Sequence, residues 1–151
     1  MESTEIVYKI KTAAEPELLT HLTKCKNNFI PALDQTVDIA QYSKKIAENA
    51  VSFEAWTGNE LIGMIAAYFN DAENKKGFIT NVSVLKEYAG KGIAAKLMTN
   101  CIVFAKEKKF SAIVLEVNNT NRPAIKLYNR FNFNNTTFKG DLNIMTLNLL
   151  D

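Results

Sequence analysis

Two side chains in the second half of the chain have the chemistry to move protons. Glu116 is the lone charge in the apolar run 112–117, and Tyr128 lies in a stretch of helical spacing that follows Asn121. A primary ammonium group has a pKa near 10, so forming the nucleophilic amine at pH 7 costs about 4 kcal/mol. A carboxylate whose pKa is raised by burial can accept that proton directly or through water, and a phenol can protonate a leaving group. Equally, Glu116 could bind main-chain amides at a strand end, and an isolated tyrosine is often a core residue.

A glycine-bearing loop precedes these residues. The run 89–95 (AGKGIAA) joins an apolar strand to a helix, and its small residues let main-chain amides at the helix N-terminus surround a phosphate or pyrophosphate. The glycines could also serve a tight turn alone. An ATPase-type loop is excluded, because Gly92 stands where that motif needs a serine or threonine for magnesium. The dinucleotide fingerprint matches Gly90, Gly92 and Ala95, with Glu116 suitably placed for a ribose. Its context fails, because residues 86–89 separate the strand from the first glycine and the N-terminal half is antiparallel.

The composition is that of a compact domain with small-molecule partners. The chain has 151 residues, 47% of them hydrophobic, so residues 1–151 are interpreted as a single domain with a full core. A net charge of +2 is too small for a nucleic-acid-binding face. Cys25 and Cys101 lie far apart and His21 is the single histidine, which predicts buried thiols without a metal site or disulfide. The residues 2–5 (ESTE) lack a signal-peptide pattern and no apolar run reaches membrane-spanning length, so cytoplasmic residence is the expected default.

Hydrophobic periodicity predicts a sheet with helices before and between its strands. The expected strands are 6–11, 51–57, 61–69, 78–85, 112–117, 133–138 and 142–149. The expected helices are 13–24, 39–49, 93–108 and 121–129. Asp38 suits a helix N-cap, and Gly58-Asn59 suits the two-residue turn of an antiparallel hairpin. This order predicts an α+β fold, in which a mixed, mostly antiparallel sheet is flanked by helices and contains one right-handed β-α-β crossover.

These motifs together resemble the GCN5-related N-acetyltransferase (GNAT) family over almost the whole chain. The resemblance is carried by the strand residues Val82-Ser83-Val84, the loop 90–95, and Asn121 with Ala124, Leu127 and Tyr128. Within the family, Leu115-Glu116-Val117 and the following helix are most similar to ribosomal-protein N-terminal alanine acetyltransferases, although the same stretch is common in other members. The resemblance implies the acyl-CoA N-acyltransferase fold and an N-acetyltransferase that uses acetyl-CoA and releases coenzyme A.

The resemblance also implies roles for individual residues. Main-chain groups of Val82 and Val84 would pair with the pantetheine arm as if it were an added strand, and loop amides would hold the pyrophosphate. Glu116 would act as the base and Tyr128 as the acid, while Asn121, itself a suitable helix cap, would contact the pantetheine arm. The implied cofactor-binding residues are Val82, Ser83, Val84, Gly90, Lys91, Gly92, Ile93, Ala94, Ala95, Asn121 and Tyr128.

Two positions depart from the family pattern. Ala89 replaces the usual Gln or Arg at the start of the loop, and Asn132 stands where a Gly-Phe pair is usual before the closing strand. Neither change removes a main-chain donor, so cofactor binding is expected to survive. The charge that a side chain at position 89 would bring could come from Lys91, Lys96 or Lys126.

The acceptor site is expected among the first two helices and the first hairpin. Candidate lining residues are Phe29, Asp34, Tyr42, Trp56, Tyr68, Asn70 and Asn81. Asp34 or Asp38 could attract an ammonium group, although each also suits a turn or cap; Asn81 and Ser83 could orient a water or the thioester carbonyl. The expected acceptor is a primary amine of a small molecule or amino sugar. A peptide or protein N-terminal amine and a non-catalytic acyl-CoA sensor are the alternatives. No nucleic-acid or membrane partner is expected, and the chain is expected to be a monomer or homodimer.

Overall fold

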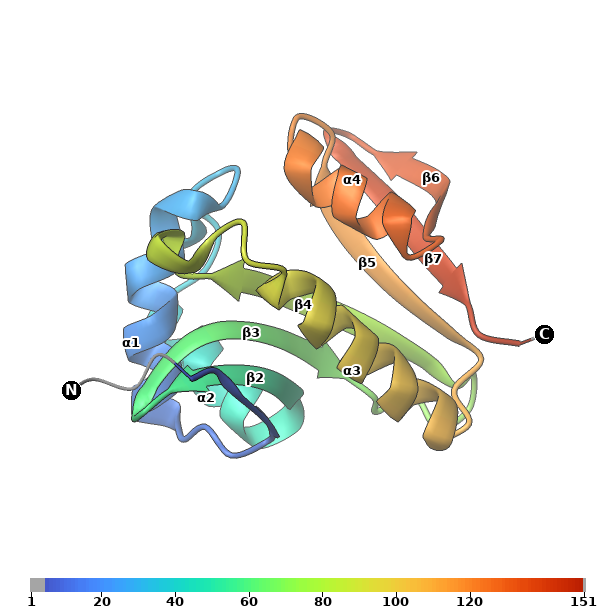
Figure 1. The fold of residues 1–151 in the computed structure, drawn as a ribbon. Helices are drawn as coiled ribbons and strands as arrows, with labels where there is room; N and C mark the ends of the chain where they lie inside the picture. The colour runs from blue at the N-terminus through green and yellow to red at the C-terminus, as the bar shows by residue number, and fades with distance from the viewer. Residues whose placement is uncertain (1–4, 151) are drawn as a thin grey trace.

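The structure, a computed structural model, describes residues 5–150, so residues 2–4 of the signal-peptide argument lie outside it. Within that part, seven strands form one sheet in the order β1-β2-β3-β4-β5-β7-β6 (Figure 1). The strands are β1 (Val7–Ile10), β2 (Val51–Thr57), β3 (Glu60–Tyr68), β4 (Lys76–Val84), β5 (Ala112–Asn118), β6 (Asn134–Lys139) and β7 (Leu142–Asn148). Strands β4 and β5 run parallel, and all other neighbours in the sheet run antiparallel. The expected mixed, mostly antiparallel α+β architecture is confirmed.

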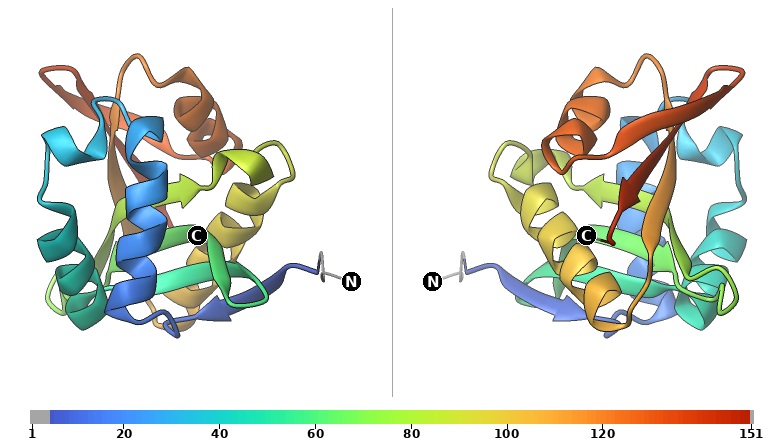
Figure 2. Two further views of the ribbon diagram at one scale, coloured as in Figure 1. Left: turned by 90° about the vertical axis from the view of Figure 1, so that its left-hand side faces the viewer. Right: turned by 90° about the vertical axis from the view of Figure 1, so that its right-hand side faces the viewer.

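Helices cover both faces of this sheet. The helices are α1 (Glu15–Cys25), α2 (Ile39–Asn49), α3 (Ile93–Glu107) and α4 (Arg122–Arg130), with 3-10 turns η1 (Lys26–Asn28), η2 (Leu33–Gln35) and η3 (Lys86–Tyr88). Helices α1 and α2 pack together on one face of β2 to β4, and α3 lies across the opposite face (Figures 1 and 2). The sheet therefore separates two hydrophobic clusters, one under each helical layer. No helix within residues 5–150 is both long enough and apolar enough to cross a membrane.

The helix ends follow from local chemistry. The Asp38 carboxylate accepts a hydrogen bond from the Gln41 amide (3.0 Å), and the Asn121 side-chain oxygen accepts one from the Ala124 amide (3.3 Å). Asp38 and Asn121 are therefore the helix caps expected from the sequence, and each satisfies a main-chain donor of the first turn. Leu19 is exposed, and the buried stripe of α1 consists of Leu18, His21, Leu22 and Cys25. Cys25 and Cys101 are buried free thiols, as expected.

Glu54 ties the N-terminal segment to the sheet from a fully buried position on β2. Its carboxylate accepts hydrogen bonds from the amides of Thr12 and Ala13 (2.9 Å each), from the hydroxyls of Thr12 and Ser52, and from the Trp56 indole (3.0 Å). Burial by itself would raise the pKa of Glu54, but these hydrogen bonds outweigh it and the pKa lies below its ordinary value. Glu54 thereby fixes the connection between β1 and α1.

Replacing Glu54 by Gln is expected to lower the free energy of unfolding by about 2–4 kcal/mol, because an amide NH2 would face groups that are themselves donors. Denaturant titration measures the loss, and Glu48→Gln on the exposed face of α2 is the control, with an expected change below about 0.5 kcal/mol. The folded-state pKa of Glu54 is lowered. The stabilisation that its carboxylate provides is therefore complete above about pH 4.3 and is lost as the pH falls through the folded-state pKa. Equal stability of the two variants at pH 7 would contradict this account of Glu54.

Candidate active site

The parallel strands β4 and β5 part halfway along the sheet. Their pairing joins Lys76–Ile79 to Ala112–Leu115 and extends no further. At the same level, the register between β3 and β4 shifts, so that Thr80 is an extra residue on β4 and forms a bulge. The Tyr42 hydroxyl of α2 donates to the Thr80 carbonyl (2.7 Å), which holds the bulge against that helix. Beyond it, residues 80–84 and 116–118 line opposite sides of an opening rather than pairing with each other.

This opening is the mouth of a cavity of about 570 Å³. Its walls come from β4, β5, α3, α4 and the segment between α1 and α2, which the ribbon views place around the diverging strands (Figures 1 and 2). The lining residues expected from the sequence are Phe29, Tyr42, Asn81, Val82, Ser83, Val84, Ala94, Glu116, Asn121 and Tyr128. One fold feature thus brings together the two proton-transfer candidates, part of the implied cofactor site and three of the acceptor candidates.

Tyr128 lies in the wall formed by α4. Its side chain is only 6% exposed and its ring packs against Phe133, with centroids 5.9 Å apart. Among the described residues, none forms a hydrogen bond with the Tyr128 hydroxyl. Burial raises the pKa of Tyr128, so the phenol remains protonated at neutral pH and retains a proton to donate.

Glu116 lines the cavity from β5, but the expectation that it is buried is wrong: its side chain is exposed. The parallel pairing with β4 ends at Leu115, one residue earlier, so no residue of β4 stands beside Glu116 to cover it. On its other side, β7 contributes Ile144 as the paired residue. Glu116 therefore lies at the open side of the cavity, where solvent can reach its carboxylate.

The loop 89–92 and the start of α3 have the backbone geometry expected of an anion site. Gly90 and Gly92 adopt φ angles of +78° and +77°, which L side chains rarely adopt, and a Cβ at either would meet nothing within 4 Å. The first hydrogen bond of α3 runs from the Lys96 amide to the Gly92 carbonyl (3.1 Å), which leaves the preceding amides of the first turn free of helix carbonyls. Ala94 lines the cavity, whereas the Ile93 side chain is buried in the core, so only its amide can contact a ligand.

Four acceptor candidates lie away from this cavity. Trp56 is buried beneath α1 and α2, where its indole donates to Glu54, because an apolar ring inside a central strand packs into the core. Tyr68 and Asn70 line a separate hollow near the other end of β4. Asp34 is exposed in η2, so its carboxylate points to solvent rather than into the cavity. The structure therefore does not place these four expected residues in the wall of this cavity.

Two groups of site residues escaped the sequence analysis. The first is the apolar run Phe29–Val37 between α1 and α2, of which Ile30, Pro31, Leu33 and Val37 join Phe29 in the cavity wall. These four residues show no helix or strand period, so no pattern in the sequence indicated that they belong to the site. The second is His21, whose position with Leu18, Leu22 and Cys25 at helical spacing could have indicated a buried histidine facing the sheet.

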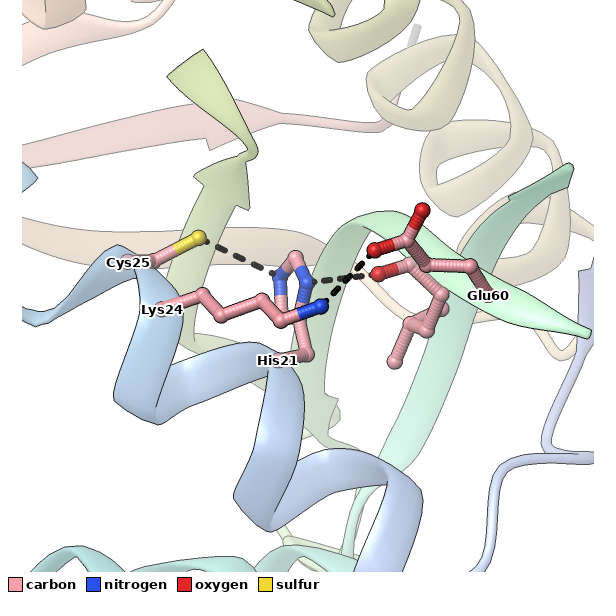
Figure 3. A network of polar contacts seen from close by, with 5 residues as sticks. His21, Lys24, Cys25 and Glu60 are labelled. Atoms are coloured by element: carbon pink, nitrogen blue, oxygen red, sulfur yellow. Dashed lines mark hydrogen bonds and ion pairs between the residues drawn. The ribbon is translucent and has the colours of Figure 1, made fainter. Parts of the chain in front are cut away.

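His21 connects α1 to the sheet behind the cavity. Figure 3 shows its ring between the Cys25 sulfur and the sheet, beside the exposed Lys24–Glu60 ion pair. Its Nδ1 lies 3.0 Å from the Leu61 carbonyl oxygen, and its Nε2 lies 2.9 Å from the Ser83 hydroxyl. The Ser83 side chain is thus occupied on the α1 side of β4, and only its main chain is available for the cofactor contact that the resemblance implies.

Coenzyme A fits this arrangement. The parted strands leave an edge of β4 without a partner strand, as an extended pantetheine arm requires. Left-handed glycines and free amides at the start of α3 meet the requirement of a pyrophosphate for donors without side-chain obstruction. Among the described residues, no group of three or more His, Cys, Asp or Glu side chains is arranged to hold a metal ion.

Comparison with known proteins agrees with this geometry. Residues 16–133 match the model of the acetyltransferase (GNAT) family. The N-alpha-acetyltransferase MAK3 of Arabidopsis thaliana is 32% identical over 82 residues, which are 54% of this chain and 43% of that protein. The chain therefore spans less than half the length of this curated relative.

Solved structures share the fold over nearly the whole chain. The ribosomal-protein-S18-alanine N-acetyltransferase of Escherichia coli superposes with a TM-score of 0.76 at 15% identity, covering 96% of each chain. The PaiA N-acetyltransferase of Thermoplasma acidophilum, solved in complex with coenzyme A, gives a TM-score of 0.74 at 16% identity, covering 94% of this chain and 99% of the other. The GNAT acyltransferase fold expected from the sequence is confirmed.

Proposed function

This chain belongs to the acetyltransferase (GNAT) family, and from that premise we propose that it transfers an acetyl group from acetyl-CoA to a primary amine. The observation that carries the proposal is that Glu116, Tyr128 and Ala94 in the first turn of α3 all line one cavity between β4 and β5. The described residues suit binding of the cofactor on the α3 side of this cavity and binding of an amine on its other side.

Each residue has a distinct task in this proposal. Amides of residues 90–95 hold the pyrophosphate, and main-chain groups of Val82 to Val84 hold the pantetheine arm beside β4. Bound acetyl-CoA supplies an activated acyl group and a thiolate leaving group. Glu116 accepts the proton of the acceptor ammonium, through water where the distance requires it, and Tyr128 donates its phenol proton to the departing sulfur. The exposure of Glu116 gives the released proton a path to solvent.

The lining supports an amine carried on an apolar body. The wall opposite α4 is formed largely by Phe29, Ile30, Pro31, Leu33 and Val37, and Glu116 is the single charged residue among those that line the cavity within the described part. An amino sugar would place hydroxyls against this apolar wall, and a polycationic amine would lack further carboxylates in the cavity. A peptide α-amine with an apolar first residue is the nearest alternative, because one relative is named as an N-alpha-acetyltransferase.

An acceptor panel tests this proposal. With acetyl-CoA held in excess, release of free thiol is followed with 2-phenylethylamine, a peptide that begins with Met, and glucosamine as acceptors. Burying a phenyl group contributes about 1.5–3 kcal/mol, so kcat/KM for 2-phenylethylamine should exceed that for glucosamine by about 10- to 100-fold. Preference for glucosamine would contradict the apolar acceptor. Thiol release that stays at the hydrolysis background with every amine would contradict acetyl transfer itself.

A further inference from the structure

Gly63 is a glycine within the central strand β3, where its own backbone does not require one. A glycine inside a strand weakens it, and it commonly marks a bulge or a close approach of another part of the chain. Four of the six glycines in the sequence adopt a positive φ, and Gly63 is not among them. The nearby register shift leaves out Ile62, whereas Gly63 pairs with Ala55 on one side and Val84 on the other. The space around Gly63 must therefore explain the glycine.

That space is filled by the first turn of α3. A Cβ at position 63 would lie 2.9 Å from Cγ2 of Ile93, 3.4 Å from Cδ1 of Leu97 and 3.5 Å from Cγ2 of Val84. Carbon atoms in contact are about 3.5–4.0 Å apart, so the Ile93 methyl group occupies the room that a side chain at position 63 would need. Ile93 is the first residue of α3 and is 2% exposed. The helix thus begins directly against the main chain of β3.

Neither side of this contact can yield by itself. Cγ2 belongs to the branched side chain of Ile93, and isoleucine in a helix has one strongly preferred χ1 rotamer. Strand β3 is hydrogen-bonded to β2 and β4 and carries α1 on its other face. A methyl group added at Gly63 therefore has to lift the first turn of α3 by roughly 0.5–1 Å before normal contact distances return.

Both ends of the glycine loop meet over Gly63. Val84, which pairs with Gly63, is the last residue of β4, and the next amide, that of Leu85, donates to the Ile62 carbonyl (2.8 Å). Ile93, where the chain enters α3, packs on the same glycine. The depth at which α3 rests on β3 consequently sets where the free amides of its first turn lie relative to the edge of β4.

We propose that Gly63 sets the depth at which α3 packs on the sheet and thereby positions the amides of its first turn for the pyrophosphate of coenzyme A. The inference rests on the proposed use of acetyl-CoA. Gly63 is not among the residues that line the cavity, so it acts through Ile93 and is a positioning residue. A larger residue at position 63 moves main-chain donors without removing any of them.

Calorimetric titration with coenzyme A, without an amine, tests this role. Gly63→Ala is expected to raise the dissociation constant at least about tenfold, because the shift moves amides beyond the usual hydrogen-bond range of about 2.7–3.2 Å, and a lost hydrogen bond to a charged group has an effect of this size. Gly77→Ala is the matched control. Its added Cβ would lie 2.6 Å from the Phe69 ring, but at the start of β4 rather than at its end. Both variants should have a lower melting temperature, and only Gly63→Ala should lose affinity.

A second substitution identifies the contact that causes the loss. Ile93→Ala removes the Cγ2 methyl group and makes room at position 63, while the main-chain amide of residue 93 is retained. In the Ile93→Ala background, adding Gly63→Ala is expected to change the dissociation constant less than about twofold. This comparison holds even if Gly63→Ala alone does not fold. A further tenfold loss of affinity in the Ile93→Ala background would overturn the proposal, because the clash would then lie elsewhere.

The outcomes separate this inference from the proposed function. If the wild-type protein binds coenzyme A and Gly63→Ala binds it equally well, the positioning role is overturned while acetyl transfer stands. If Gly63→Ala weakens coenzyme A binding as expected but the wild-type protein acetylates no amine in the panel, the positioning role stands and the proposed function fails. A wild-type protein that does not bind coenzyme A would contradict both.

Discussion

Tyr128→Phe is expected to lower kcat for acetyl transfer by about 100-fold or more, while the KM for acetyl-CoA changes by less than about threefold. The substitution removes only a hydroxyl that forms no hydrogen bond with the described residues, so the packing of the ring against Phe133 is retained. What is lost is the proton for the departing sulfur, and that loss affects the chemical step rather than cofactor binding. Steady-state kinetics with a saturating amine measures the effect.

Tyr8→Phe is the matched control, because it removes a phenol hydroxyl from β1, none of whose residues lines the cavity. Its kcat should equal that of the wild-type protein. An unchanged melting temperature of Tyr128→Phe would confirm that the loss is not one of folding. Wild-type kcat in Tyr128→Phe would rule out the acid role and leave Tyr128 as a core residue.

The second large effect is expected at the glycine loop. Gly92→Ala should weaken coenzyme A binding at least about tenfold, because an alanine at a φ of +77° favours a shift of the backbone, and a shift moves the amides that face the pyrophosphate. Left-handed backbone costs an L residue about 1–2 kcal/mol, so a modest loss of stability accompanies the loss of affinity. Calorimetric titration with coenzyme A measures the dissociation constant.

Gly140→Ala separates backbone strain from ligand binding. Gly140 also has a positive φ (+60°) and open space around an added Cβ, but it lies in the turn between β6 and β7. The two variants should lose similar stability, and only Gly92→Ala should lose affinity. Equal coenzyme A affinity in both variants would show that the loop does not hold the cofactor.

The sequence was sufficient to predict most of the architecture where local signals agree. The helix Ile39–Asn49 was predicted with its observed bounds, because Asp38 provides a cap at the point where helical periodicity begins. The strand Val51–Thr57 was predicted equally well, since a turn with Gly58 at positive φ follows a run rich in β-branched and aromatic residues. In both cases the local propensity and the tertiary fold require the same conformation.

The site was predicted less completely because its shape depends on long-range pairing. No local pattern indicates that β4 and β5 part after Ile79 and Leu115 or that Thr80 forms a bulge, yet these two features make the cavity. The exposure of Glu116 follows from that parting, so an apolar run in the sequence gave the wrong burial. The glycines and Tyr128 could be identified because a motif fixes their positions relative to a helix end. Trp56 was expected to line the site but lies in the core, because the sequence does not show which face of its strand meets the core.

Periodicity in the sequence also does not indicate apolar lining residues that lie outside helices and strands. Phe29–Val37 contains neither a helix nor a strand of useful length, and its turn η2 is set by packing against α1 and α2 rather than by local preference. Its role in the cavity emerges only when β4 is placed opposite. The hydrogen bonds of His21 are long-range in the same sense, because Leu61 and Ser83 are 40 and 62 residues away in sequence.

The proposed acetyl transfer requires that main-chain groups between the parted strands bind the cofactor. An amide ¹H–¹⁵N spectrum recorded during a titration with coenzyme A tests this most directly. We expect saturable changes in the amide signals of residues 82–84 and 90–95, with those of β6 unchanged. If these amides stay unchanged with coenzyme A while a nicotinamide dinucleotide shifts them, the cofactor assignment and the proposed acetyl transfer are both contradicted.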